Sequence, residues 1–264
     1  MKVVLTIAGS DSGGGAGIQA DLRTFAAHGL HGTSAITAVT AQNSVTVTDW
    51  VALEPRMVVA QVEAVASDMP IAAVKTGMLA NRGIVAAVAE VVRRLSLPHV
   101  VVDPVMVAKG GARLLDLEAE RAYPERLFAV AEVLTPNLPE AEALLGRPVR
   151  TREAMREAAR ELQGRGPRVV VVKGGHLAGD EAVDVFYDGR RLEELSAPRV
   201  ATRNTHGTGC TYSAAIAARL ALGSEPLEAV RGAKEYLTEA IRRAYGVGRG
   251  HGPVDHLHPL TRRD

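Results

Sequence analysis

Short valine-rich apolar runs alternate along this chain with longer stretches of helical character. The runs are apolar throughout and do not alternate with polar residues, which is typical of strands covered by helices on both faces. The sequence therefore predicts an α/β fold of three layers, α/β/α, around a mostly parallel central sheet. The expected strands cover residues 3–8, 34–39, 71–75, 100–103, 133–135 and 169–173.

Helices are expected between and after these strands, and several carry end signals. Pro55 stands where a first helical turn tolerates proline, Asn81 and Thr151 are good N-caps, and Gly29 is suited to end a helix. The expected helices cover residues 15–28, 55–67, 81–95, 151–162, 211–222 and 226–244.

Two stretches depart from the parallel pattern. Residues 45–53 read VTVTDWVAL, and residues 182–195 read as a hairpin around Asp188-Gly189. Both are expected to add a small antiparallel edge to the sheet. No linker rich in Pro, Gly or Ser marks a domain boundary, so residues 1–264 are expected to form a single domain.

Charge and composition favour a small-molecule partner. The 31 basic and 30 acidic residues leave a net charge of +1, with no basic surface expected for nucleic acid or an anionic membrane. No stretch approaches the roughly 18 uninterrupted apolar residues of a membrane span. The N-terminus resembles neither a secretion signal nor a transit peptide, so a cytoplasmic location is expected. A single cysteine, Cys210, cannot form an internal disulfide.

The first glycine-rich motif, GSDSGGGAG at residues 9–17, follows a strand and opens a helix. Ligands bind at this place in α/β folds, because the strand end meets the positive end of a helix. Residues 15–20 fit a dinucleotide fingerprint in form, but the acidic residue expected about 20 positions later is absent from residues 40–43. A tight turn without a ligand remains the simpler alternative.

The second motif, NTHGTGCT at residues 204–211, precedes an apolar helix. Its small residues are expected to leave backbone N–H groups pointing outward and form an anion hole from Gly207, Thr208, Gly209 and Cys210. A thiol at a helix N-terminus is expected to have a lowered pKa and to be able to act as a base. The alternative is a buried, inert cysteine.

Polar residues follow three of the expected strands. They are Asp103, Lys173, and Asn137 with Glu140, and all should emerge at the sheet edge that holds the first glycine motif. Two carboxylates beside a lysine suit Mg²⁺ and phosphate, because Mg²⁺ takes one or two carboxylates plus phosphate oxygens and water. Each residue alone is equally well explained as a loop or cap residue, and Glu140 as a first-turn helical residue.

Two weaker candidates complete the survey. The C-terminal histidines, His251, His256 and His258, lack a cluster of acidic or cysteine ligands and are interpreted as loop residues. The segment 109–111, Lys-Gly-Gly, has the composition of a flap over a site, although surface loops look the same.

Seven segments together make the chain similar to a known family. In order they are TIAGSDSGGGAGIQADL, ITAVTAQNS, VKTGML, VVVDPVM, LTPNLPEAEAL, VVVKGGH and NTHGTGCTYSAAIA. The chain resembles the hydroxymethylpyrimidine/phosphomethylpyrimidine kinases of thiamine biosynthesis, in the ribokinase-like superfamily, from Leu5 to about Leu257. It departs from the family at Ser12-Gly13 and Thr40, which bears on loop rigidity or a backbone contact.

The resemblance implies a role for each matching residue. Gln42 reads the aminopyrimidine edge, and Met78 packs on the ring. Asp103 and Glu140 hold Mg²⁺, while Lys173 contacts ATP phosphates. The remaining implied positions are Asp21, Gly9 and Thr40 beside the substrate, Asn137 and Thr208 beside ATP, and Gly207 to Cys210 as the anion hole.

The implied activity is phosphorylation of 4-amino-5-hydroxymethyl-2-methylpyrimidine by ATP with Mg²⁺, followed by phosphorylation of the monophosphate to the diphosphate. The resemblance also implies a homodimer. A pyridoxal kinase of the same fold is the nearest alternative. An NAD-dependent oxidoreductase and a non-catalytic pyrimidine-binding regulator are alternatives of other classes.

Overall fold

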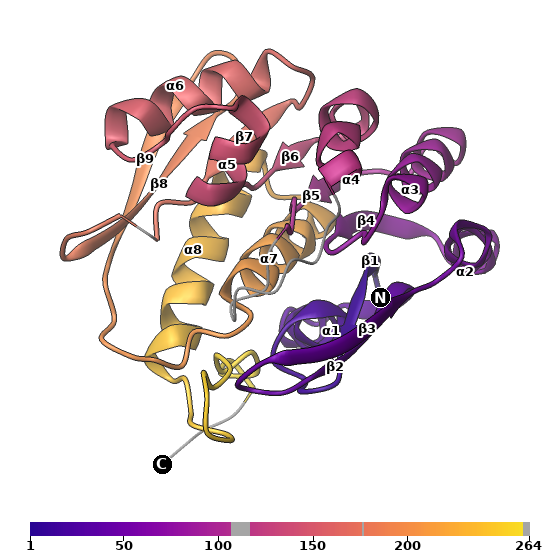
Figure 1. Cartoon of the computed structure of the whole chain (residues 1–264), viewed down its shortest axis with the longest axis horizontal. Helices are drawn as coiled ribbons and strands as arrows, with labels where there is room; N and C mark the ends of the chain where they lie inside the picture. Colours follow the sequence, from indigo (N-terminus) through magenta and orange to yellow (C-terminus); the bar gives the residue numbers. More distant parts are fainter. Residues whose placement is uncertain (107–116, 176, 261–264) are drawn as a thin grey trace.

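The computed structural model describes residues 1–106, 117–175 and 177–260, with side chains left out at 117–119. A nine-stranded sheet runs through the molecule in the order β3-β2-β1-β4-β5-β6-β7-β8-β9 (Figure 1). The strands are β1 (Val3–Asp11), β2 (His31–Gln42), β3 (Val47–Ala52), β4 (Ile71–Thr76), β5 (Val100–Val102), β6 (Val133–Leu134), β7 (Val169–Val172), β8 (Glu181–Tyr187) and β9 (Leu192–Pro198).

The central strands are parallel, as the apolar runs predict. Parallel pairing joins β2, β1, β4, β5, β6 and β7, and β3 pairs antiparallel with β2. The β8–β9 hairpin adds to the other side through an antiparallel pairing of β8 with β7. The expected three-layer fold is confirmed. The two antiparallel additions lie at opposite edges of the sheet, however, and not at one edge.

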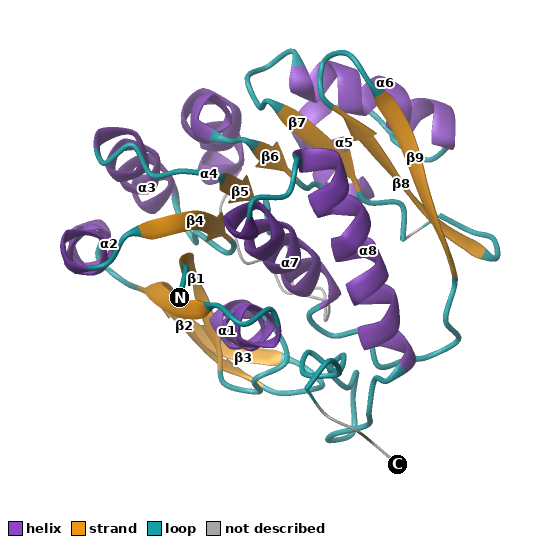
Figure 2. Ribbon diagram, turned by 180° about the vertical axis from the view of Figure 1, so that it is seen from behind, coloured by secondary structure: helices purple, strands orange, loops and turns teal. Residues whose placement is uncertain are grey.

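Helices cover both faces of the sheet (Figure 2). On one face lie α1, α7 and α8, and on the other lie α2 to α6. Both faces are covered because the central strands present apolar side chains in both directions. The helices are α1 (Gly17–Ala27), α2 (Pro55–Asp68), α3 (Arg82–Arg94), α4 (Leu117–Ala122), α5 (Leu138–Leu145), α6 (Arg152–Gln163), α7 (Thr208–Leu222) and α8 (Pro226–Arg242), with a π turn at Tyr123–Leu127 and a 3₁₀ turn at Phe128–Val130.

The apolar core is divided by the sheet into two clusters. All four valines of β7 are buried, and they alternate between the clusters: Val170 and Val172 pack toward α6, and Val169 and Val171 toward α7 and α8. This two-sided burial explains why these strands read as continuous apolar runs. Within the described residues, the structure contains no helix that combines the length and the apolar character needed to cross a bilayer.

One helix boundary bears on function. The sequence predicts a start at residue 211, but α7 begins at Thr208, directly after Gly207. Gly207 has φ +80°, a conformation that glycine adopts without strain, so the chain turns into the helix three residues early. The small motif residues therefore form the first turn of α7. The candidate flap at 109–111 lies outside the described residues.

Replacement of Gly174 tests the packing at the end of β7. A Cβ at Gly174 would lie 1.9 Å from the carbonyl oxygen of Val183 and 2.8 Å from Met155, whereas a Cβ at Gly175 meets nothing within 4 Å. We expect Gly174→Ala to lower the free energy of unfolding by about 1–3 kcal/mol, because the backbone of β8 must shift. Gly175→Ala is the matched control and should stay within about 0.5 kcal/mol of the parent. Urea unfolding measures both, and equal stabilities would contradict the expected clash.

Candidate active site

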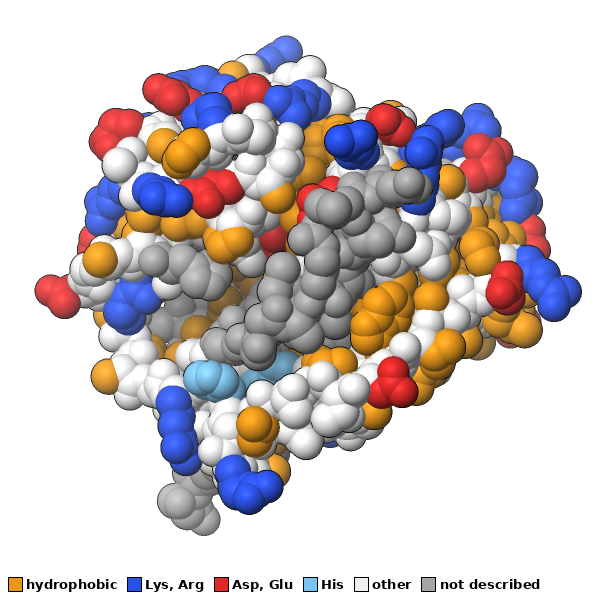
Figure 3. All heavy atoms as spheres, viewed as in Figure 1, with side chains coloured by type: hydrophobic (Ala, Val, Ile, Leu, Met, Phe, Trp, Pro, Cys, Tyr) orange, Lys and Arg blue, Asp and Glu red, His pale blue; other side chains and the backbone are white. Residues whose placement is uncertain are grey.

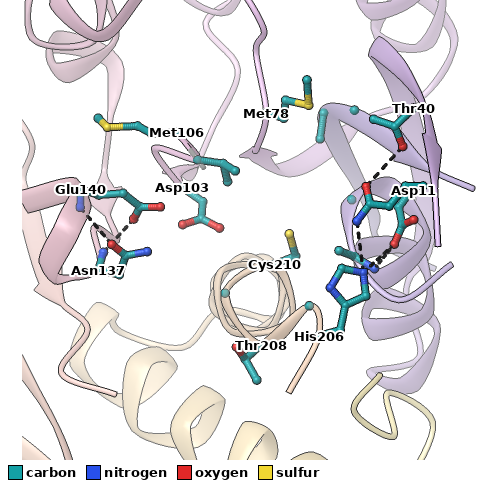
Figure 4. Close-up of a pocket in the computed structure, with 18 of the residues that line it drawn as sticks. Asp11, Thr40, Met78, Asp103, Met106, Asn137, Glu140, His206, Thr208 and Cys210 are labelled. Carbon is teal, nitrogen blue, oxygen red and sulfur yellow. Dashed lines mark hydrogen bonds and ion pairs between the residues drawn. The ribbon is translucent and has the colours of Figure 1, made fainter. Parts of the chain in front are cut away.

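A cavity of about 660 Å³ opens where the parallel strands end and α7 begins. Its walls come from the first glycine motif, the ends of β2, β4 and β5, the start of α5, Lys173 after β7, and the first turn of α7. The carboxyl ends of parallel strands meet at this edge, as the sequence predicts. Figure 4 shows Asp103 and Glu140 on one side of the cavity, Thr40 and Asp11 on the other, and Cys210 on α7 between them.

Lys173 joins the two carboxylates on the acidic side. Its Nζ lies 2.7 Å from Oδ1 of Asp103 and 3.9 Å from Oε2 of Glu140. Burial opposes ionisation of Asp103, but Lys173 and Lys75 outweigh it and hold the pKa of Asp103 below its usual range. Burial and the charge of Asp103 raise the pKa of Glu140 to about 7. The structure therefore brings together three of the four residues expected from strand ends.

Asn137 and Glu140 also begin α5. The Asn137 side chain accepts the N–H of Glu140, and the Glu140 carboxylate accepts the N–H of Asn137, which is a capping box. Glu140 therefore has the first-turn position that the simpler interpretation proposed. Both residues nevertheless line the cavity, and the cap fixes the direction of the Glu140 side chain.

The second glycine motif fits tightly against the first. A Cβ at Gly207 would lie 1.9 Å from the carbonyl oxygen of Gly15. Gly209 faces the acidic side, since a Cβ there would lie 3.5 Å from Nζ of Lys173 and 3.7 Å from Oδ2 of Asp103. The N-terminal turn of α7, where the first N–H groups of a helix have no intrahelical partner, thus opens into the cavity beside Lys173.

The expectation of an acidic thiol is wrong for this structure. Burial raises the pKa of Cys210 to about 11, with Asp21 and Asp103 adding to the shift and Lys75 opposing it. The desolvation of the sulfur outweighs the favourable field of the helix N-terminus. At neutral pH the thiol is therefore protonated. It still lines the cavity, where α7 directs it toward the centre (Figure 4).

Asp21 does not border the cavity, contrary to the role that the resemblance implied. It is fully buried behind Lys75, with Oδ2 2.8 Å from Nζ of Lys75 and 2.6 Å from the Thr6 hydroxyl that donates to it. Lys75 does line the cavity and was missed in the sequence. Burial alone would lower the pKa of Lys75, but the negative charges of Asp21 and Asp103 outweigh burial and raise it. A lysine inside the apolar run IAAVKT was the available signal.

The opposite side of the cavity is less charged. Gly9, Thr40, Gln42 and Met78 all line it, as the resemblance implied. Gly9 allows Met78 close approach, since a Cβ at Gly9 would lie 3.0 Å from the Met78 sulfur. The Met78 side chain therefore offers an apolar surface suited to a flat ring, while Met106 lines the cavity on the side of Glu140 (Figure 4).

A hydrogen bond between Asp11 and His206 completes this side and was also missed. Nε2 of His206 lies 3.0 Å from Oδ2 of Asp11, and 3.4 Å from the carboxamide of Gln42. Burial alone would raise the pKa of Asp11, but His206 and the N–H groups of Ala16 and Gly13 lower it below its usual value. Both residues stand inside the two glycine motifs, so sequence proximity to those motifs was the only signal.

Comparison with known proteins supports the expected family. The sequence profile described as phosphomethylpyrimidine kinase matches residues 11–255. A hydroxymethylpyrimidine/phosphomethylpyrimidine kinase of Synechococcus elongatus is 49% identical over 98% of this chain and 99% of its own length. The thiamine biosynthesis bifunctional protein ThiED of Geobacter sulfurreducens is 51% identical over 96% of this chain, and the chain spans about half (52%) of that relative.

Solved structures show the same fold. The ADP complex of Bacillus subtilis pyridoxal kinase is 40% identical, with a TM-score of 0.92 over 99% of this chain and 100% of that one. A phosphomethylpyrimidine kinase from Clostridium difficile is 42% identical, with a TM-score of 0.81 over 91% of this chain and 100% of that one. The sequence relatives and the solved structures therefore both indicate a kinase. They give no support to the oxidoreductase alternative. The chain, with its ribokinase-like fold, belongs to the phosphomethylpyrimidine kinase family.

Proposed function

We propose that this chain transfers the γ-phosphoryl group of ATP to the hydroxymethyl oxygen of 4-amino-5-hydroxymethyl-2-methylpyrimidine, and then a second one to the resulting monophosphate. The observation that carries this proposal is a single cavity with a carboxamide and an apolar wall at one end, and a helix N-terminus with a lysine and two carboxylates at the other. Since one sheet edge supplies the whole cavity, we also propose that the chain acts as one domain.

The less charged end is proposed to hold the pyrimidine. Gln42 can donate and accept a hydrogen bond at once, which matches a ring nitrogen beside an exocyclic amine. Met78 packs against the ring, Gly9 leaves room for it, and Thr40 contacts the Gln42 carboxamide. The ring is thereby placed within the same cavity as the first turn of α7.

The charged end is proposed to hold the ATP phosphates and Mg²⁺. Within the described residues no group of three or more acidic, histidine or cysteine side chains is placed to enclose a metal ion. Asp103 and Glu140 instead form an open pair of carboxylates, and this donor set suits Mg²⁺, which keeps waters and phosphate oxygens as its other ligands. When bound, Mg²⁺ would neutralise charge on the phosphates.

The chain's own residues supply position and positive potential. Lys173 is charged, since the carboxylates beside it raise its pKa against the effect of burial, and it faces the N-terminal turn of α7. The N–H groups from Gly207 to Cys210 can stabilise the equatorial oxygens of the transferring phosphoryl group, with Thr208 at the helix start. Asn137 has its side-chain oxygen committed to the cap of α5, which leaves its amide nitrogen for a phosphate oxygen.

A pyridoxal kinase activity is the second candidate. It is favoured by the similarity in fold to the Bacillus subtilis pyridoxal kinase described above, with 40% sequence identity. Pyridoxal also presents a hydroxymethyl group on a flat aromatic ring, so the same transfer geometry applies. Gln42 favours the aminopyrimidine over pyridoxal, because its donor and acceptor pair suits an amine beside a ring nitrogen.

A homodimer is proposed through the edge of the sheet at β3. Val39 and Val51 are paired across β2 and β3 and are 45% and 60% exposed, and Met57 on α2 is 52% exposed. Figure 3 shows hydrophobic side chains gathered along the side of the molecule where β3 and α2 lie. An exposed apolar area of this kind is typical of a surface that another chain covers.

Light scattering tests the dimer directly. The parent chain is expected at twice the mass of one chain, and Val51→Glu is expected to shift it toward the monomer because a carboxylate would be buried in an apolar contact. Leu222→Glu, at a side chain that is 50% exposed at the end of α7, is the control and should leave the mass unchanged. If the unmodified chain is a monomer, the dimer proposal is refuted and the proposed catalytic activity is unaffected.

Product analysis tests the activity. Incubation with ATP, Mg²⁺ and the aminopyrimidine alcohol should yield the monophosphate and then the diphosphate. Omission of Mg²⁺ should abolish both, since the carboxylate pair repels the phosphates when no cation lies between them. Pyridoxal in place of the alcohol measures the second candidate. Transfer to pyridoxal alone would reverse the order of the two candidates, and transfer to neither would refute both.

Cys210→Ala separates two roles for the thiol. Because the thiol is protonated at neutral pH, we expect it to shape the anion hole and not to act as a base. The variant should then slow phosphorylation of the alcohol and of the monophosphate by similar factors, since the N–H groups of α7 serve both steps. Single-turnover assays with each substrate measure the two rates. A loss of roughly 10²–10⁴-fold confined to the alcohol would restore the general-base role.

A further inference from the structure

The carboxylate of Asp11 holds His206 in one orientation. It accepts N–H groups from Gly13 at 2.8 Å, Gly15 at 3.0 Å and Ala16 at 2.8 Å, and Nε2 of His206 lies 3.0 Å from its Oδ2. The imidazole is packed against the first glycine motif, since a Cβ at Gly15 would lie 2.4 Å from its Cδ2 atom. An ionised carboxylate only accepts hydrogen bonds, so Nε2 of His206 carries a proton and donates it.

The proton on His206 determines which way the Gln42 carboxamide faces. One end of the carboxamide lies 3.4 Å from Nε2 of His206, and the other end lies 3.3 Å from the Thr40 hydroxyl. That hydroxyl has one proton, which it donates to the carbonyl oxygen of Ser10 at 2.9 Å. Thr40 can therefore only accept from the carboxamide, and Nε2 of His206, whose single proton is directed at Asp11, has no lone pair with which to accept from it.

Carboxamide oxygen and nitrogen have nearly the same size, so the surrounding donors and acceptors decide their positions. With the nitrogen toward His206, one N–H would face another and the oxygen would face a hydroxyl whose proton is already used. With the oxygen toward His206 and the nitrogen toward Thr40, the nitrogen donates to the Thr40 hydroxyl, and the oxygen lies against the polarised N–H of the imidazole. The second orientation is therefore the favourable one.

This orientation sets the direction of a bound aminopyrimidine. The carboxamide presents its free acceptor on the His206 side and its free N–H on the Thr40 side. An exocyclic amine then lies toward His206, and the adjacent ring nitrogen lies toward Thr40. The hydroxymethyl group is on the ring carbon beyond the amine, so it extends past His206 toward the first turn of α7, next to which Figure 4 shows His206. The reverse orientation would turn the hydroxymethyl group away from that turn.

We infer that His206, held by Asp11, is a positioning residue that locks the Gln42 carboxamide and thereby selects a 4-aminopyrimidine with its hydroxymethyl group directed at the N-terminus of α7. This inference rests on the proposed function, because it specifies how the proposed substrate is read. It predicts discrimination against the 4-oxo analogue, in which a ring N–H donor and an exocyclic oxygen acceptor reverse the hydrogen-bonding pattern. A site with fixed buried polar groups rejects such a reversal strongly.

The test compares kcat/KM for the 4-amino and 4-oxo alcohols in the parent and in His206→Leu, with ATP and Mg²⁺ saturating. The parent should prefer the 4-amino alcohol, and His206→Leu should reduce that preference at least tenfold, because the released carboxamide can face either way. The KM for ATP should change by less than twofold. A merely structural role for His206 would lower both rates together and leave the preference unchanged.

Two further variants control the test. His206→Gln retains an N–H donor that can face Asp11 and Gln42, so it should keep most of the preference. Thr40→Val removes the acceptor at the other end of the carboxamide and should reduce the preference even if His206→Leu does not fold.

The possible outcomes are separable. If folded His206→Leu keeps the preference unchanged, the positioning role is wrong and the proposed kinase activity stands. If only Thr40→Val folds, an unchanged preference in that variant leads to the same conclusion. Failure of the parent to phosphorylate the 4-amino alcohol overturns the proposed function, and the inference with it.

Discussion

A row of paired buried charges along the wall of the cavity is the constraint on which the rest of the structure depends. Lys75 pairs with Asp21, and Lys173 pairs with Asp103, while Glu140 lies beside Lys173. Burying an unpaired charge costs several kcal/mol, so each lysine requires a carboxylate from another element. The pairs therefore tie β4 to α1, and the loop after β7 to the end of β5.

Because each lysine is paired with a carboxylate, these buried groups carry little net charge. The N-terminal turn of α7 faces this row, and it adds its own positive field beside Lys173. The same burial that strengthens these interactions disfavours ionisation of the Cys210 thiol. Burial therefore both strengthens the interactions that would bind phosphate and disfavours a thiolate base at Cys210.

The two glycine motifs meet at the other end of the cavity through close backbone contact. Gly207 fits against the carbonyl of Gly15, and Asp11 pairs with His206. A side chain at Gly207 would separate the motifs, and the contact between His206 and Gln42 would then be lost. This contact fixes the distance between the proposed pyrimidine end and the proposed phosphate end of the cavity.

The sequence by itself determined the layers of the fold and the edge at which the site lies. Continuous apolar runs such as VVVV in β7 require burial on both faces, and polar residues that follow such runs must emerge together at the carboxyl edge, as Asp103 and Lys173 do. The glycine motifs and the family resemblance located Gln42, Gly9 and Met78, all of which line the cavity.

Only the tertiary structure decided what depends on burial and on contacts between distant residues. Asp21 was expected beside the substrate but lies behind Lys75, 54 positions away. The 195 positions between Asp11 and His206 hide their hydrogen bond from any local pattern. The pKa of Cys210 followed desolvation by the assembled core and not the local helix terminus that the motif revealed. Local sequence reports periodicity and turn chemistry, whereas electrostatic environment is a sum over neighbours that exist only once the chain has folded.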